Sequence, residues 1–257
     1  MIFRRAVVAG TFALLIAVAA SAAAAGADQG YTVDGSDTFR VGDNDALTQT
    51  LYHGLQRLSI ARSGSTTTYV ARVEYDKNGA SGKQHQRASF STTVLASGEQ
   101  RDGPSRDPDY LTVLNQPFSV QLDTPTMRDL GHVKRPVPFD FPSPMTGATL
   151  HGTLRRLPDA LVGGVRAMGI AFGANGPLHG SLPDRPAMEL AGTITMKGTA
   201  YYSYDSALLL ALDATLAIEG NLDATARRSP VSIVYARSIR HATGQQAASI
   251  KPLPHRT

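Results

Sequence analysis

Apolar and polar residues alternate along the segment 190–204, and this pattern constrains the fold more than any other feature of the chain. The apolar positions are Leu190, Ile194, Met196, Ala200, Tyr202 and Tyr204. Most of the positions between them hold threonine, lysine or serine. Because successive side chains of a β-strand point to opposite faces, the pattern predicts a strand with one face on a core and the other in water.

Two further strands follow with the same alternation. The second begins after a turn at 205–206, and its apolar face carries Leu208, Leu210, Leu212, Leu216 and Ile218. The third runs over 231–239, so the three strands predict an antiparallel meander. The first strand would extend roughly 50 Å at about 3.3 Å per residue, and it must curl within a compact domain. Gly192 and Gly198 lie on its apolar face and permit such a bend.

The front half of the chain shows the alternation less regularly. We predict additional strands over 51–61, 69–75, 88–96, 118–122, 148–157 and 164–172. In the first of these the leucines recur at helical spacing, but Gly54 and the turn at 63–65 favour a strand. We therefore expect a mainly β protein whose long, curled antiparallel strands form a half-barrel, a barrel or a sandwich, with at most one or two short helices.

One helix and a proline-rich connector interrupt the strands. Thr124 followed by Pro125 is typical of a helix N-terminus, and Gly131 is typical of a helix end. Four prolines then lie between residues 136 and 144. Because proline lacks the N–H group that a central strand needs, we expect this connector on a sheet edge or between two halves of the domain, 51–123 and 148–239.

The N-terminal residues have the layout of a secretory signal peptide. Arg4 and Arg5 precede a long apolar run that ends in small residues. We expect residues 1–27 to be removed by cleavage after Ala25 or Ala27, the alternative being an uncleaved anchor, since the run is long enough to span a bilayer. The protein is then exported, to the periplasm or the extracellular space.

The remaining chain divides into a lead segment, 28–50, the β domain, 51–239, and a basic flexible tail, 240–257. Six basic residues and no acidic residue follow residue 224, whereas the preceding body is acidic. This basic end fits an anionic lipid or polysaccharide. It also fits a last strand that pairs with acidic neighbours and continues into a solvated tail.

The chain contains no motif that identifies a catalytic, cofactor or metal site. It has no cysteine, so disulfides, thiolate ligands and a thiol nucleophile are excluded. No two of its seven histidines are spaced to share one face of a strand or helix, and we expect neither a metal nor a cofactor. The acidic body and the few aromatic residues argue against nucleic-acid binding. Asp107 and Asp109 belong to a long polar loop, Ser97–Asp109, where we expect solvated carboxylates.

The arrangement of long amphipathic strands around a proline-rich connector resembles that of bacterial envelope proteins with the half-barrel fold of lipoprotein carriers. It is also similar to exported families of unknown function. The resemblance concerns the layout of residues 51–240 and no specific motif, so it transfers no site residue. The curled antiparallel strands themselves predict a concave apolar face that a second sheet, a loop or a ligand must cover.

Three functions are compatible with these observations. The first is a non-catalytic carrier that holds a lipid chain or another apolar ligand on the concave face, with the Ser97–Asp109 loop as a cover. Its predicted ligand-binding residues are Leu190, Ile194, Met196, Tyr202, Leu208, Leu210 and Leu212. The second is a structural or assembly protein of the envelope with a protein partner. The third is a hydrolase whose site is scattered over strand ends.

Overall fold

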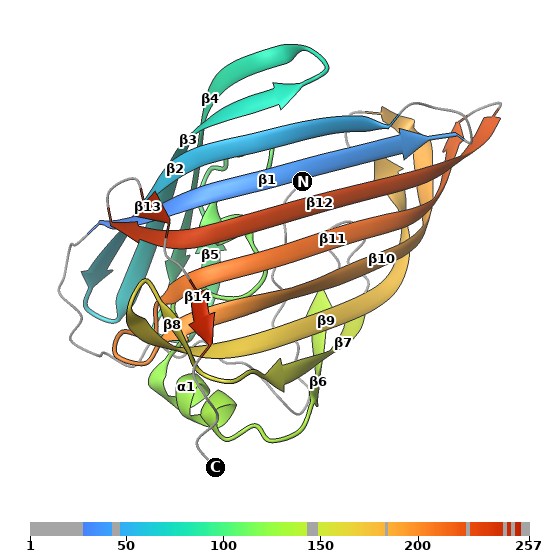
Figure 1. The fold of residues 1–257 in the computed structure, drawn as a ribbon. Coiled ribbons are helices and arrows are strands. Elements are labelled where there is room, and N and C mark those ends of the chain that lie inside the picture. Colours follow the sequence, from blue (N-terminus) through green and yellow to red (C-terminus); the bar gives the residue numbers. More distant parts are fainter. Residues whose placement is uncertain are drawn as a thin grey trace.

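The computed structural model describes residues 28–42, 47–142, 149–182, 185–224, 227–243, 246–247 and 250–252. Within these residues the chain is mainly β, with one large antiparallel sheet and one short α-helix (Figure 1). The expected fold class is therefore confirmed. The predicted signal segment, 1–27, lies outside the described residues.

Long antiparallel strands build the sheet. In chain order these are β1 (Gln29–Val41), β2 (Thr48–Ser63), β3 (Thr66–Gly79), β4 (Gly82–Val94), β5 (Gln100–Asp102), β6 (Val137–Pro142), β7 (Thr149–Arg156), β8 (Ala160–Val162), β9 (Val165–Leu182), β10 (Arg185–Ser203), β11 (Leu209–Ala224), β12 (Arg227–Thr243), β13 (Gln246–Ala247) and β14 (Ile250–Pro252). Their spatial order is β14-β8-β9-β10-β11-β12-β1-β2-β3-β4-β5, with β7 also on β9, β6 on β7 and β13 on β12. Among the described residues no pairing joins β5 to the opposite end, so the sheet is open.

The predicted meander is confirmed as β10, β11 and β12. Ile194 lies opposite Ile218, and Ile218 lies opposite Ile233 on the third strand. These three side chains are buried in the main core, as the alternation of apolar residues requires. Alternation of apolar residues is therefore sufficient to predict the inward face over this part of the meander.

The segment expected to be a lead contains β1, a central strand of the sheet. β1 pairs with β12 on one side and with β2 on the other, so strands from early and late parts of the sequence are neighbours here. Its inward positions include Tyr31 and Val33, but also Gly35 and Asp37. The glycine and the aspartate interrupt the apolar alternation, which explains why the pattern did not predict a strand there.

The ambiguous leucine-rich segment belongs to β2, as the strand prediction required. Its buried residues include Tyr52, Gln56 and Leu58, whereas Leu51 and Leu55 point outward and are 48% and 39% exposed. The leucines that recur at helical spacing thus lie on both faces of one strand, with Leu51 and Leu55 outside and Leu58 inside. The outward leucines leave apolar side chains on the convex face.

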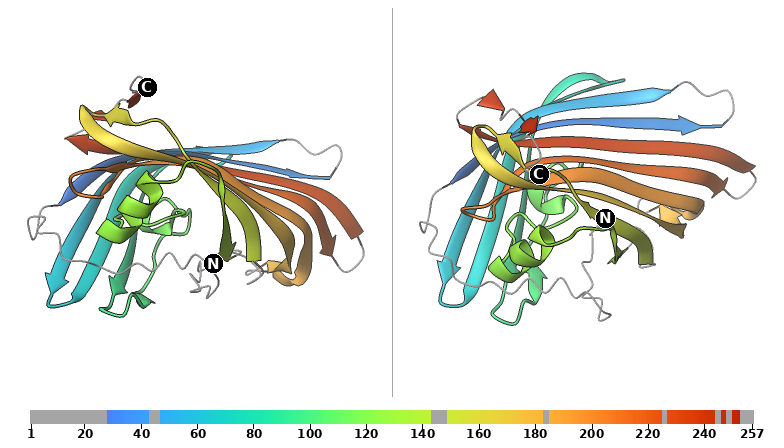
Figure 2. Two further views of the ribbon diagram at one scale, coloured as in Figure 1. Left: turned by 90° about the horizontal axis from the view of Figure 1, so that it is seen from below. Right: turned by 60° about the horizontal axis from the view of Figure 1, so that its bottom comes forward.

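The sheet curves, and a connecting segment fills much of its concave side (Figure 2). We call residues 103–136 the cover segment; it includes the 3₁₀ turn η1 (Val113–Asn115) and the helix α1 (Thr124–Gly131). The apolar side chains of Leu111, Val120 and Leu130 are buried in the same core as the inward residues of the strands. Their burial removes apolar surface from water on both the sheet and the cover segment, and this holds the two layers together.

Two local predictions in the cover segment need correction. Residues 118–122 form no strand: Phe118 has a φ of 70°, which a β-strand does not allow, and the pairing is a single bridge between Gln121 and Leu208. The helix is present, but its N-cap is Asp123 rather than Thr124. The carboxylate of Asp123 accepts a hydrogen bond of 2.6 Å from the backbone N–H of Thr126.

The proline-rich connector contains β6, which within the described ranges pairs with β7 alone and so lies on a sheet edge. This is the location that missing N–H groups permit. Close packing also explains Gly192, because a Cβ atom there would fall on the main chain of β11. Glycine at this position permits the close approach of β10 and β11.

The alternation fails at one position near the turn between β10 and β11. The pairing register shifts between Tyr201 and Tyr202. Leu208 and Leu212 still belong to the main core, but Leu210 packs in a small second cluster with Val162, Ala167 and Ala211. Leu210 therefore does not share the face that the sequence pattern assigned to it.

Candidate functional site

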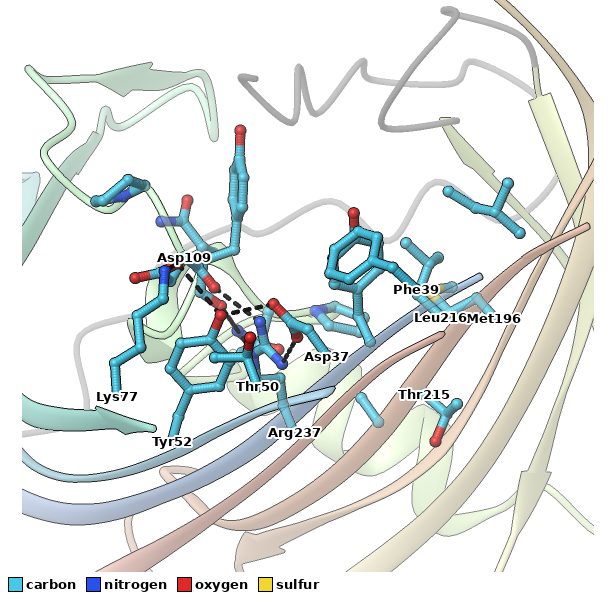
Figure 3. Close-up of a pocket in the computed structure, with 18 residues that line it drawn as sticks. Asp37, Phe39, Thr50, Tyr52, Lys77, Asp109, Met196, Thr215, Leu216 and Arg237 are labelled. Atoms are coloured by element: carbon cyan, nitrogen blue, oxygen red, sulfur yellow. Dashed lines mark hydrogen bonds and ion pairs between the residues drawn. The ribbon is translucent and has the colours of Figure 1, made fainter. Parts of the chain in front are cut away.

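A cavity of about 330 Å³ lies on the concave side, between the middle of the sheet and the cover segment. The sheet contributes side chains from β1, β2, β3, β10, β11 and β12, and the cover segment contributes residues between Pro108 and Pro117. Figure 3 shows charged side chains grouped at one end, with Phe39, Leu216 and Met196 at the other. The cavity is therefore amphipathic along its length.

The apolar end is built from inward positions of adjacent strands. Its side chains are Phe39, Met196, Ala214, Leu216, Ile218 and Tyr235. The rings of Phe39 and Tyr235 meet edge to face, with their centroids 5.7 Å apart. Phe39, Leu216 and Tyr235 are only half-buried, so apolar surface remains accessible to a ligand at this end.

A buried ion pair anchors the polar end. Arg237 on β12 donates a hydrogen bond of 2.6 Å from Nη1 to Asp37 Oδ1 on β1, and both side chains are 6% exposed. Arg237 Nη2 also donates to the main-chain oxygen of Asp109 at 2.7 Å. Since a buried charge is costly unless it is paired and hydrogen-bonded, these contacts hold the two charges in place.

A second set of contacts involves the carboxylate of Asp109 in the cover segment. Lys77 Nζ lies 2.7 Å from Asp109 Oδ1, and the hydroxyl of Tyr75 donates a hydrogen bond of 2.6 Å to Oδ2. Lys77 and Tyr75 are alternate residues of β3 and share its inward face. A Cβ atom on the facing Gly54 would lie only 2.6 Å from Tyr75 Cβ, so glycine makes room for the tyrosine.

Tyr52 lies between the two carboxylates. Its hydroxyl is 2.9 Å from Asp37 Oδ2 and 3.3 Å from Asp109 Oδ1. A phenol has one hydrogen to donate, and the shorter distance assigns it to Asp37. The cationic groups of Arg237 and Lys77 lie 5.1 Å and 5.6 Å from the centre of the Tyr52 ring. We refer to Asp37, Tyr52, Tyr75, Lys77, Asp109 and Arg237 as the polar cluster.

The tyrosines around the cavity stay neutral far above physiological pH. Burial, followed by the charge of Asp37, raises the pKa of Tyr52, and burial with the hydrogen bond to Asp109 raises the pKa of Tyr75. Burial also raises the pKa of Tyr235 to about 12. These phenols can therefore act as hydrogen-bond donors to an anionic group, but not as bases near neutral pH.

The two loop carboxylates are not solvated, contrary to the sequence-based expectation. Asp107 is 4% exposed and accepts hydrogen bonds from the backbone N–H groups of Leu111 and Thr112 and from the side-chain amide of Asn115. The Asp109 side chain is 11% exposed. For Asp109 the expectation was wrong because its donors, Tyr75 and Lys77, lie on β3, more than 30 residues earlier in the chain.

The residues predicted to bind a ligand lie mainly in the filled core. Of the seven, Met196 lines the cavity. The other six, Leu190, Ile194, Tyr202, Leu208, Leu210 and Leu212, are buried against other parts of the chain. The predicted Ser97–Asp109 cover contributes Pro108 and Asp109, and the remaining cover of the cavity comes from Tyr110 to Pro117.

The histidines that the structure describes lie away from this site. The described residues that line the cavity include no histidine. His53, His85 and His151 each contact an aspartate of the neighbouring strand on an exposed surface. In the described part of the chain, no group of three or more histidine, aspartate or glutamate residues is placed to hold a metal ion. The same residues include no helix with the length and hydrophobicity of a membrane span.

Sequence comparison supplies no relative whose role could be transferred to this cavity. No protein-family model matches the chain, and no curated protein matches its sequence.

Proposed function

We propose that this protein is a non-catalytic carrier or binder of a small apolar or amphipathic ligand, and that the ligand occupies the cavity on the concave face. The observation that carries the proposal is the cavity of about 330 Å³. It has an apolar end and a polar end whose charged side chains pair with one another. Ligand sites typically measure roughly 300–1,000 Å³ and are mostly apolar, with a few fixed polar groups. The volume favours one short chain or a single ring system over a complete membrane lipid.

The energetic argument rests on the accessible apolar wall. Each methylene group transferred from water into such a site stabilises the complex by about 0.8 kcal/mol. The side chains of Phe39, Leu216 and Tyr235 are held by strands in the middle of the sheet, so little reorganisation is needed on binding. The described cavity lining contains no histidine and no free nucleophile–base pair, and this favours binding over hydrolysis.

The compartment forms part of the same proposal. The basic, apolar and small-residue layout of residues 1–27 supports export to the periplasm or the extracellular space. A carrier there would shield an apolar molecule from water during its transit between other components of the envelope.

A role in envelope assembly is the second candidate. The observation that favours it is the row of exposed leucines on the convex face of β2 and the residue before it, Leu47, Leu51 and Leu55. Crosslinking in intact envelopes from positions next to this row tests it. A specific crosslinked partner that is lost with Leu51→Ser supports assembly, and the absence of any such partner contradicts it.

The binding proposal is tested with a neutral fluorescent probe, N-phenylnaphthylamine, titrated into the purified protein. Ala214→Phe places a ring inside the cavity, and Thr195→Phe adds the same ring on the exposed outer face of β10 as a matched control. We expect saturable binding to the unmodified protein and to Thr195→Phe, and binding weakened about tenfold or more in Ala214→Phe. Equal binding by both variants, or no saturable binding by the unmodified protein, contradicts the proposal.

A further inference from the structure

We propose that the cavity selects an amphiphile with a carboxylate head group, which takes the place of the Asp109 carboxylate on Lys77 and Tyr75. This inference rests on the proposed function and adds the chemical class of the ligand. The ligand head would lie at the polar cluster, and its chain would extend toward Phe39, Leu216 and Met196 (Figure 3).

The geometry of the donors supports this exchange. Lys77 and Tyr75 are fixed on β3, which is hydrogen-bonded on both sides within the sheet, and they converge on a single carboxylate. That carboxylate belongs to the cover segment and not to the sheet. Because Lys77 and Tyr75 bind a carboxylate that a connecting loop supplies, they can also bind a carboxylate that a ligand supplies.

The cover segment is anchored before Asp109 and strained after it. Asp107 is held by three hydrogen bonds from donors in the same segment, so the loop has a fixed base. Tyr110 has a φ of 50°, a left-handed conformation that a bulky residue adopts only when its surroundings impose it. Arg237 also holds the main-chain oxygens of Asp109 and Tyr110, so the Asp109 side chain can leave its donors without disturbing the anchored base.

Tyr52 adds a second reason why Asp109 can be exchanged. Its single hydroxyl hydrogen is donated to Asp37, the nearer carboxylate. The same hydroxyl oxygen lies 3.3 Å from Asp109 Oδ1 and has no second hydrogen to donate to it. Among the described residues, the Asp109 carboxylate thus receives full hydrogen bonds from Lys77 and Tyr75 alone. A ligand carboxylate that keeps those two contacts loses nothing at Tyr52.

The charge balance favours an anion that displaces Asp109 over other ligands. Lys77 and Arg237 balance Asp37 and Asp109 in the polar cluster. An anion added beside the intact cluster would leave an uncompensated negative charge in a half-buried place, which is costly. An anion that replaces Asp109, whose side chain then moves into water, keeps the cluster neutral. A cationic ligand would find both carboxylates already engaged.

The test compares decanoate with decanol, which share an alkyl chain and differ in the head group. Binding of each is measured by displacement of N-phenylnaphthylamine from the unmodified protein, Asp109→Asn and Lys77→Met. Asp109→Asn removes the competing charge, and we expect it to strengthen decanoate binding about tenfold while decanol binding is unchanged. Lys77→Met keeps the aliphatic stem and is expected to weaken decanoate selectively.

Asp102→Asn is the matched control, because it removes an exposed carboxylate of β5 that does not line the cavity. Circular dichroism verifies that each variant is folded. If Asp109→Asn leaves the ratio of decanoate to decanol affinity unchanged, the exchange mechanism is wrong, although the cavity still binds ligands. If neither compound nor the probe binds any variant, the proposed function itself is refuted.

Discussion

Replacement of Arg237 by leucine tests whether the buried ion pair organises the polar end of the cavity. The Arg237 and Asp37 side chains are each 6% exposed, and their charged atoms are 2.6 Å apart. Without the guanidinium group, the carboxylate of Asp37 stays buried and keeps the hydrogen bond from Tyr52 at 2.9 Å. Arg237→Leu therefore leaves a buried charge without its ion-pair partner.

The expected loss of stability has two parts. Removal of one member of a buried ion pair costs about 3–5 kcal/mol. Arg237 also donates to the main-chain oxygens of Asp109 and Tyr110 in the cover segment, and each net hydrogen bond contributes about 0.5–1.5 kcal/mol. We expect Arg237→Leu to lower the free energy of unfolding by about 4–8 kcal/mol, a large share of the stability of an ordinary domain.

A double replacement separates the two parts. Asp37→Leu combined with Arg237→Leu leaves no orphaned charge and loses mainly the contacts to the cover segment, so we expect a cost of about 1–3 kcal/mol. The double variant is thus expected to be more stable than Arg237→Leu alone. Such strong coupling between two residues in direct contact is what a double-mutant cycle measures.

Urea unfolding followed by far-ultraviolet circular dichroism is the assay, because the chain contains no tryptophan. Arg228→Leu is the control, since the Arg228 side chain is 67% exposed and lies 3.5 Å from Asp223. Its loss is expected to change stability by less than about 0.5 kcal/mol. The reasoning is refuted if Arg237→Leu is as mild as this control, or if the two single replacements add up to the double.

Three further outcomes follow from the packing and the titration of single groups. Gly192→Ala is expected to destabilise the fold by about 1–3 kcal/mol in urea unfolding, because the added methyl group would meet the main chain of β11. Gly173→Ala is the control and is expected to be tolerated, since its methyl group would have no neighbour nearer than 3.9 Å. Asp107→Ala removes the acceptor of three hydrogen bonds, so we expect a loss of about 1–3 kcal/mol and faster proteolytic cleavage of the cover segment; unchanged cleavage would argue against the anchoring role. Burial raises the pKa of Tyr110 and of Tyr235 to about 12. Because an unfolded phenol ionises near pH 10, this contribution to stability is complete below about pH 10 and is lost as the pH rises toward about 12. A tyrosinate absorbance titration with the same midpoint in native and urea-unfolded protein would contradict it.

Strand prediction succeeded where each face of a strand had one chemical character. β10 and β11 alternate apolar with polar residues over most of their length, so the period of two was enough to identify both strands and their inward faces. β1 was missed because Gly35 and Asp37 occupy inward positions. Its place between β2 and β12 depends on pairing with residues at the other end of the chain, and local sequence carries no information on that.

The cavity was less predictable than the sheet, since its shape depends on which part of the concave face the cover segment fills. The leucines of the meander were expected to line a hollow, and the cover segment and neighbouring strands bury most of them instead. The space that remains lies further along β11, at Ala214, Leu216 and Ile218. Alternation specifies which residues point inward, but it does not specify what they meet there.

One signal in the sequence does point to the polar end of the cavity. In the predicted strand 231–239, the inward register passes through Val231, Ile233 and Tyr235, continues with Arg237 and ends at Ile239. A charge in such a register must find a partner of opposite sign, because an unpaired charge in a core costs far more than the strand gains by burial. Asp37 occupies an inward position on the adjacent strand, 200 residues earlier, and supplies that partner. Charged residues of opposite sign at the inward positions of amphipathic strands are therefore the feature by which sequences of this kind can be searched for a binding site.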